Sequence, residues 1–126
     1  MPSDQFLASL AKLNLLKADI QPFVRGLRLP NWVIENQSGE DRLSIIALKW
    51  RFDASVGVLD DPTSTYGMMG EAFKAATGCI KELYRKALDL DDADMERSIQ
   101  ALEEIADAVG TRIFNSPLRD ELRPNP

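Results

Sequence analysis

The side chains of this sequence that are best suited to chemistry are carboxylates, and they gather in one stretch. This acidic stretch comprises Asp89, Asp91, Asp92, Asp94, Glu96, Glu103, Glu104 and Asp107. Carboxylate oxygens are the ligands that Mg²⁺ and Mn²⁺ prefer in proteins. One interpretation of the stretch is therefore a divalent-cation site.

The acidic stretch has two other interpretations. Helical spacing places four of its members on one face, namely Asp92, Glu96, Glu103 and Asp107. Such a face would mimic nucleic-acid phosphates and make the chain an inhibitor of a nucleic-acid-binding protein. Alternatively, the carboxylates only favour a helix N-terminus and pair with basic side chains of the preceding helix. Those basic side chains are Lys74, Lys81 and Arg85.

Within the stretch, Glu104 and Asp107 have the spacing E-x-x-D. This segment resembles one carboxylate motif of the all-α nucleotide pyrophosphohydrolases. In that family, E-x-x-E on one helix and E-x-x-D on another hold Mg²⁺ against a triphosphate. The resemblance implies a metal site at Glu104 and Asp107, in a hydrolase of a phosphorylated small molecule. The preceding helix carries Glu71 and Glu82 instead of an E-x-x-E, so only half of the motif is present.

Histidine is absent from the sequence, and Cys79 is the single cysteine. The chain alone therefore cannot build an internal disulfide, a zinc site of the usual ligands, or a Cys–His or Ser–His nucleophile pair. An enzyme would have to use carboxylates, Lys, Arg, Tyr or Ser. We expect no cofactor, and the single cysteine predicts a reducing, cytoplasmic location.

Two tryptophans with nearby arginines form a candidate binding patch, made of Trp32, Trp50, Arg28 and Arg51. Trp and Arg are enriched among the residues that dominate interface energies. One interpretation is therefore an anchor patch for a partner protein. The alternative is that both tryptophans fill the core of a small domain.

The net charge of −5 is unevenly distributed, because residues 1–59 carry +1 and residues 60–126 carry −6. The chain as a whole lacks the basic footprint that nonspecific nucleic-acid binding requires. A local basic patch within residues 12–51 remains an alternative, and it would suit a small helical subunit of a nucleoprotein complex. Its members would be Lys12, Lys17, Arg25, Arg28, Arg42, Lys49 and Arg51.

Two heptad stripes predict the elements that position these residues. The first stripe is Tyr66, Met69, Phe73, Ala76, Ile80, Leu83, Ala87 and Leu90; the second is Met95, Ile99, Leu102, Ala106, Val109 and Ile113. Apolar residues spaced alternately three and four apart predict helices that pack lengthwise. Because the break between the stripes is short, we expect an antiparallel αα-hairpin of residues 64–90 and 91–115.

The first hairpin helix also contains Gly67, Gly70 and Gly78. A glycine in a helix interior costs about 1 kcal/mol relative to alanine. With Ala72 and Ala75 these residues give the helix a surface of small side chains, which would permit close approach by another helix. Alternatively, the first two glycines mark an irregular first turn.

The first quarter of the chain predicts one helix and one irregular segment. Ser3 is a good N-cap, Phe6 begins an apolar stripe that ends at Ile20, and Pro22 is expected to bound the helix. Residues 21–39 contain prolines and glycines but are largely apolar. We expect a short helical turn and an extended piece packed over the bundle.

Residues 40–59 have two patterns. Residues 48–53 alternate as a strand would, whereas a longer stripe from Ile45 through Phe52 to Leu59 has helical spacing. The longer stripe favours a helix. Residues 116–126 are predicted to form a short turn and a tail.

Together these patterns predict one all-α domain of residues 1–126, a small helical bundle built on the hairpin. No apolar run approaches the length of a membrane-spanning helix, so we expect no membrane contact. The hairpin seams are rich in Ala and bury little, which favours a homo-oligomer. We expect a non-enzymatic module of protein–protein contact: an adaptor, assembly subunit, chaperone or inhibitor. Its partner would bind the acidic face or the 21–39 segment.

Overall fold

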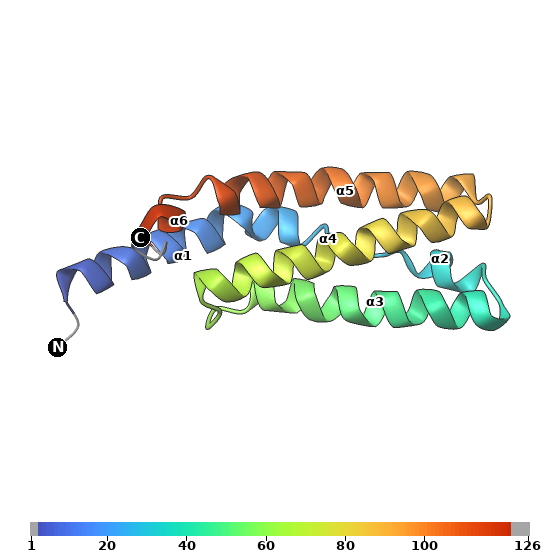
Figure 1. The fold of residues 1–126 in the computed structure, drawn as a ribbon, viewed down its shortest axis with the longest axis horizontal. Helices are drawn as coiled ribbons and strands as arrows, with labels where there is room; N and C mark the ends of the chain where they lie inside the picture. Colours follow the sequence, from blue (N-terminus) through green and yellow to red (C-terminus); the bar gives the residue numbers. More distant parts are fainter. Residues whose placement is uncertain (1–2, 122–126) are drawn as a thin grey trace.

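The computed structural model describes residues 3–121, which form an elongated bundle of α-helices (Figure 1). In chain order the helices are α1 (Asp4–Val24), α2 (Asn31–Glu35), α3 (Gly39–Asp60), α4 (Tyr66–Asp89), α5 (Ala93–Phe114) and α6 (Leu118–Glu121). The all-α prediction is confirmed, and α3 is helical throughout the segment that also had a strand pattern. The tail beyond residue 121 lies outside the described residues.

The four long helices run alternately in opposite directions (Figure 1). Helix α4 packs against both α3 and α5, and α1 packs against α5 and, less extensively, α3. The pair of α4 and α5 is the predicted αα-hairpin. Helix α6 is the predicted turn after the hairpin, and it returns to contact α1.

The core follows the stripes that the sequence shows. All six residues of the second hairpin stripe are buried, and so are most of the first. Helix α3 contributes Ile45 and Phe52, both fully buried, and α1 contributes Ile20. Every long helix therefore places an apolar face in one shared core.

Side-chain caps define three of the helix starts. Ser3 Oγ accepts from the Phe6 amide (3.1 Å), Thr65 Oγ1 accepts from the Met68 amide (3.2 Å), and Asp92 Oδ1 accepts from the Met95 amide. Each cap satisfies an N–H group that lacks a partner within the helix.

The expectation that Pro22 bounds the first helix is wrong, because α1 continues through it to Val24. Proline cannot donate to the carbonyl four residues back, but only a short stretch of helix follows it. Tertiary contacts stabilise this last turn: Val24 is buried, and the Arg112 guanidinium lies 4.2 Å from the centroid of the Phe23 ring.

The 21–39 segment is only partly irregular. Its ends belong to α1 and α3, and α2 is the expected short helical turn. Leu27, Leu29 and Val33 are buried, so the segment covers the core as predicted. Gly39 begins α3 with φ of +59°, a backbone conformation that favours glycine. None of the helices formed by residues 3–121 combines the length and apolar character needed to cross a membrane.

Candidate protein-interaction site

Exposed large apolar side chains concentrate on two helices, although those of α1 lie on more than one of its faces. Within the described residues they are Phe6, Leu7, Leu10, Leu15, Leu43, Trp50, Met68 and Leu88. Half of them lie on the first half of α1, and two lie on α3. Single exposed apolar residues are ordinary, whereas a group on one surface marks an interaction site.

The first half of α1, residues 4–15, extends past the ends of α3 and α4 (Figure 1), and we call it the α1 overhang. The apolar stripe of α1 is continuous, but α3 and α4 cover only its second half, and beside its first half lies only the short helix α6 among residues 3–121. Leu16 and Ile20 are buried, whereas Phe6 is 56% exposed and Leu10 is 42% exposed. The stripe is therefore longer than the bundle that it covers.

A groove of about 690 Å³ lies between the α1 overhang and the turn that joins α3 to α4. The overhang contributes Phe6, Leu10 and Leu13, and the opposite wall is formed by residues 62–66 and Leu118. Lys17 is the one charged side chain among the described residues that line the groove. A mostly apolar concave surface with a few polar groups is typical of a binding site.

The wall opposite the overhang is held by hydrogen bonds within its turn. Asp61 Oδ1 accepts from both the amide and the hydroxyl of Thr63 at 2.8 Å. These bonds, with a smaller contribution from the positive charge of Lys17, hold the pKa of Asp61 below its ordinary value. Lys17 Nζ donates to the Pro62 carbonyl (2.7 Å), and buried Ser64 donates to the Val58 carbonyl (2.7 Å). This wall is therefore formed before any ligand binds.

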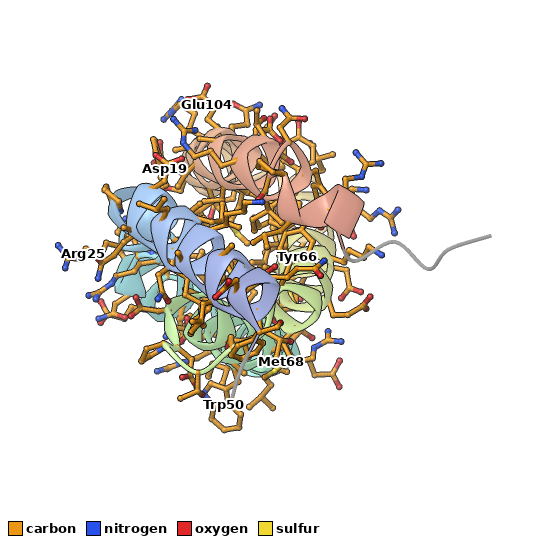
Figure 2. All side chains as sticks on the ribbon, turned by 90° about the vertical axis from the view of Figure 1, so that its left-hand side faces the viewer. Asp19, Arg25, Trp50, Tyr66, Met68 and Glu104 are labelled. Carbon is orange, nitrogen blue, oxygen red and sulfur yellow. The ribbon has the colours of Figure 1, made fainter. Side chains whose placement is uncertain are left out.

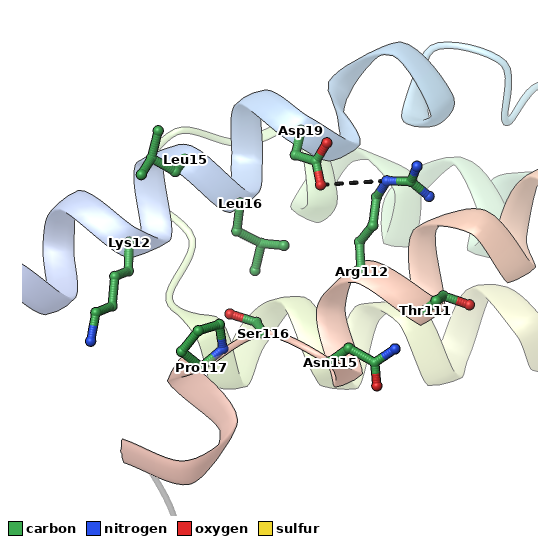
Figure 3. Close-up of a pocket in the computed structure, with 9 residues that line it drawn as sticks. All are labelled: Lys12, Leu15, Leu16, Asp19, Thr111, Arg112, Asn115, Ser116 and Pro117. Atoms are coloured by element: carbon green, nitrogen blue, oxygen red, sulfur yellow. Dashed lines mark ion pairs between the residues drawn. The ribbon is translucent and has the colours of Figure 1, made fainter.

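A second cleft, of about 660 Å³, lies between α1 and the C-terminal end of α5 (Figure 3). Its charged groups hold the two helices together. Arg112 Nε lies 3.4 Å from Asp19 Oδ2, and Arg112 Nη1 donates to the Ala108 carbonyl (2.9 Å). The guanidinium also packs on the Phe23 ring. Arg112 therefore positions α1 rather than presenting a free charge to a ligand.

The other exposed apolar surface lies on α3, and we call it the α3 face. It consists of Leu43, Ala47, Trp50, Ala54 and Gly57, all exposed and spaced 4, 3, 4 and 3 residues apart. Trp50 is 71% exposed and Leu43 is 67% exposed. The Trp50 side chain extends away from the bundle (Figure 2). This seam lies opposite the stripe that α3 buries, and none of the other helices formed by residues 3–121 covers it.

The structure does not assemble the predicted tryptophan–arginine patch. Trp32 is half-buried on α2 and lines a hollow beside Arg97 of α5. Trp50 lies on the outer side of α3, and the neighbouring Arg51 pairs with Glu82 of α4 (3.1 Å). Arg28 is exposed in the loop before α2.

Three carboxylates of the acidic stretch contact groups of the same chain. Besides capping α5, Asp92 accepts from the Gln37 side chain (3.2 Å). Glu96 accepts from the Tyr84 hydroxyl (3.2 Å), and Asp94 pairs with Arg97.

The remaining candidate carboxylates lie farther along α5. Glu103 and Asp107 line a shallow hollow of about 410 Å³ that also contains Lys81, and Glu104 is exposed on the outer side (Figure 2). Across residues 3–121, the structure shows no group of three or more acidic, Cys or His side chains placed to hold a metal ion. Lys74 pairs with Glu71 of its own helix (3.7 Å) rather than with α5.

The basic residues of the first half are spread over α1, the following loop and α3. Several are engaged locally: Lys17 with the Pro62 carbonyl, Lys49 with Asp53 (2.6 Å), and Arg51 with Glu82. A nucleic-acid surface built from them would have to compete with these contacts.

Replacing Asp92 with alanine lowers the free energy of unfolding by about 1 kcal/mol, because α5 loses its N-cap. Replacing Asp94, which is exposed and pairs only across one turn, changes it by less than about 0.5 kcal/mol. Urea denaturation followed by circular dichroism measures both. Equal losses would show that the acidic stretch acts through its overall charge rather than through the cap.

No protein-family model, curated protein or solved structure matches this chain. The groove beneath the α1 overhang and the α3 face carry the exposed apolar side chains. In the acidic stretch, the contacts that the structure shows are with groups of the chain itself.

Proposed function

We propose that this protein is a non-enzymatic interaction module that holds an apolar helical segment of a partner protein in the groove beneath the α1 overhang. The observation that carries the proposal is the continuation of the α1 stripe past the end of the bundle. Phe6 and Leu10 continue the apolar stripe of α1 but remain 56% and 42% exposed. Burying a large apolar side chain contributes roughly 1.5–3 kcal/mol, so a partner that covers them gains affinity.

An amphipathic helix is the occupant that suits this geometry. Helices bind apolar grooves through anchors spaced three, four and seven residues apart, and the overhang offers Phe6, Leu10 and Leu13 at such a spacing. Twelve helical residues span about 18 Å, which sets the length of the contact. The turn that forms the opposite wall is already ordered, which reduces the entropy lost on binding.

An adaptor, assembly subunit, chaperone or inhibitor would all act in this way. The proposal places the protein in the cytoplasm, which is consistent with a chain that has a single cysteine and that cysteine buried. Burial raises the pKa of the Cys79 thiol, which disfavours the thiolate, and Cys79 does not line the groove.

The test is site-specific photo-cross-linking in the native host. A photoreactive amino acid is placed at Phe6, at Leu10, or at Leu88 as a matched control, because Leu88 is exposed on α4 away from the groove. We expect the same partner protein to be captured from positions 6 and 10 but not from position 88. With that partner purified, Phe6→Glu should weaken binding more than tenfold, as is typical of a central interface residue.

Capture from all three positions alike, or from none, would overturn the proposal. A partner whose affinity is unchanged by Phe6→Glu would also contradict it. In either case the module would have to act through another surface.

A further inference from the structure

The α3 face lies outside the groove, and the proposed function does not use it. Its large and small side chains alternate: Leu43 and Trp50 are seven residues apart, and Ala47 and Ala54 lie between and after them. A Cβ added at Gly57 would meet nothing within 4 Å, so no contact inside the chain requires glycine there. Glycine in a helix interior is less stable than alanine. Gly57 is therefore unfavourable for α3 itself, and no contact among the described residues accounts for it.

We propose that the α3 face is the interface of a homodimer, in which the α3 helices of two copies pack antiparallel about a two-fold axis. The seam alternates between two positions, one occupied by Leu43, Trp50 and Gly57 and the other by Ala47 and Ala54. In an antiparallel helix pair, residues at one position pack against residues at the other position of the partner helix. An axis between Ala47 and Trp50 places Trp50 against the partner's Ala47 and Leu43 against the partner's Ala54. The four central layers then each pair a large apolar side chain with a small one, an arrangement that fills a seam without clash or void. At each end of the seam, Gly57 lies against Glu40 of the other copy.

Neighbouring registers fit less well. A shift by one heptad in one direction places Leu43 against the partner's Asp61, and a shift in the other places Trp50 against the partner's Glu40. The second shift places the Glu40 carboxylate beside the large apolar Trp50 ring, which is unfavourable. The first shift places Leu43 against Asp61, which lies beyond the end of α3. The residues of α3 therefore favour the register centred between Ala47 and Trp50.

The size and charge of the face suit a second copy. Helix α3 has 22 residues and is about 33 Å long. Interfaces bury about 800 Å² per partner, and a tryptophan alone supplies on the order of 200 Å². Met68 lies on the same side of the bundle (Figure 2) and extends the apolar surface.

Ion pairs neutralise the edges of the face. Lys49 with Asp53 lies along one side, and Arg51 with Glu82 lies along the other. These ion pairs reduce the repulsion between two copies that each carry a net charge of −5.

Sedimentation velocity on the full chain tests the proposal. We expect wild type to be a dimer at concentrations on the order of 10–100 μM, and Trp50→Glu to raise the dissociation constant at least 100-fold. Leu15→Glu is the matched control, because Leu15 is 72% exposed on α1, and this variant should remain a dimer. Circular dichroism establishes that both variants are folded. A monomeric wild type, or equal dissociation of the two variants, would overturn the proposal.

Disulfide formation tests the register. The double variant Leu43→Cys with Ala54→Cys should form a covalent dimer on mild oxidation, because these positions face each other across the axis. Each single variant should not, because each position lies about 16 Å along the helix axis from its own copy in the antiparallel pair. Covalent dimers of the single variants would overturn the antiparallel arrangement. The result of the disulfide experiment does not affect photo-cross-linking from position 6. The dimer and the partner-binding groove are therefore tested separately.

Discussion

Replacing Phe52 with alanine lowers the free energy of unfolding by about 3–5 kcal/mol. The Phe52 side chain has no exposed surface and is the largest fully buried side chain of the core. Its removal loses apolar burial and leaves a cavity that the surrounding helices fill only partly. A domain of this size is stable by about 5–15 kcal/mol, so the loss is a substantial fraction of the total free energy of unfolding.

The matched control is the same substitution at Phe6, which is 56% exposed on the α1 overhang. Phe6→Ala should change the free energy of unfolding by no more than about 0.5 kcal/mol. Urea denaturation at one fixed protein concentration measures both variants, because self-association would otherwise shift the midpoint. Similar losses at the two positions would contradict the distinction between the core and the unpacked part of the α1 stripe.

The same Gly→Ala substitution should have opposite effects at two positions of the hairpin. Gly110 of α5 is buried, and a Cβ added there would lie 2.9 Å from Phe73 Cε1 of α4 and closer still to Cζ. The Phe73 ring packs edge to face on Phe114 (5.5 Å between centroids), so it cannot move without disturbing a second contact. Overpacking of this kind costs about 1–3 kcal/mol, more than the helix propensity gained.

Gly78 of α4 is exposed, and a Cβ added there would meet nothing within 4 Å. Gly78→Ala should therefore raise the free energy of unfolding by up to about 1 kcal/mol through helix propensity alone. Thermal and urea denaturation measure both variants. Stabilisation by both substitutions would show that α4 and α5 do not approach closely at Phe73.

The hairpin was predictable because its information is local. Two long stripes of strict spacing and a short break determine two helices and their direction, whichever elements surround them. Helix α3 was predictable because the stripe through Ile45 and Phe52 outlasts the strand-like alternation.

The surfaces were harder to predict because they depend on relative placement. Trp32 and Trp50 are equivalent by residue type, and the docking of α2 makes one half-buried while the other lies outside the core. The overhang depends on how far α1 is offset along α5, which no local pattern records. The sequence of α3 does contain a pattern that could have predicted the α3 face, because its residues follow heptad spacing. The pattern is weak because three of its five positions are Ala or Gly, which contribute little apolar surface.

Proline within a helix was the clearest case in which tertiary structure overrides local preference. Pro22 favours a helix end, but the burial of Val24 and the stacking of Arg112 on Phe23 lie outside any sequence window. These contacts come from residues about ninety positions away, so the last turn of α1 is stabilised by the rest of the fold.

The α1 overhang has a consequence for how binding and helix formation depend on one another. Isolated helices of about 12 residues are marginal in water, because nucleating the first turn is costly whereas extending an existing helix is not. The docked second half of α1 supplies the nucleus, and the overhang extends the helix from it, so we expect fraying to begin at the turn next to Ser3. A ligand in the groove contacts the frayed turns directly, so its affinity includes the free energy of ordering them. Substitutions that change only helix propensity in residues 4–15, without touching the ligand, would therefore tune how tightly the partner is held.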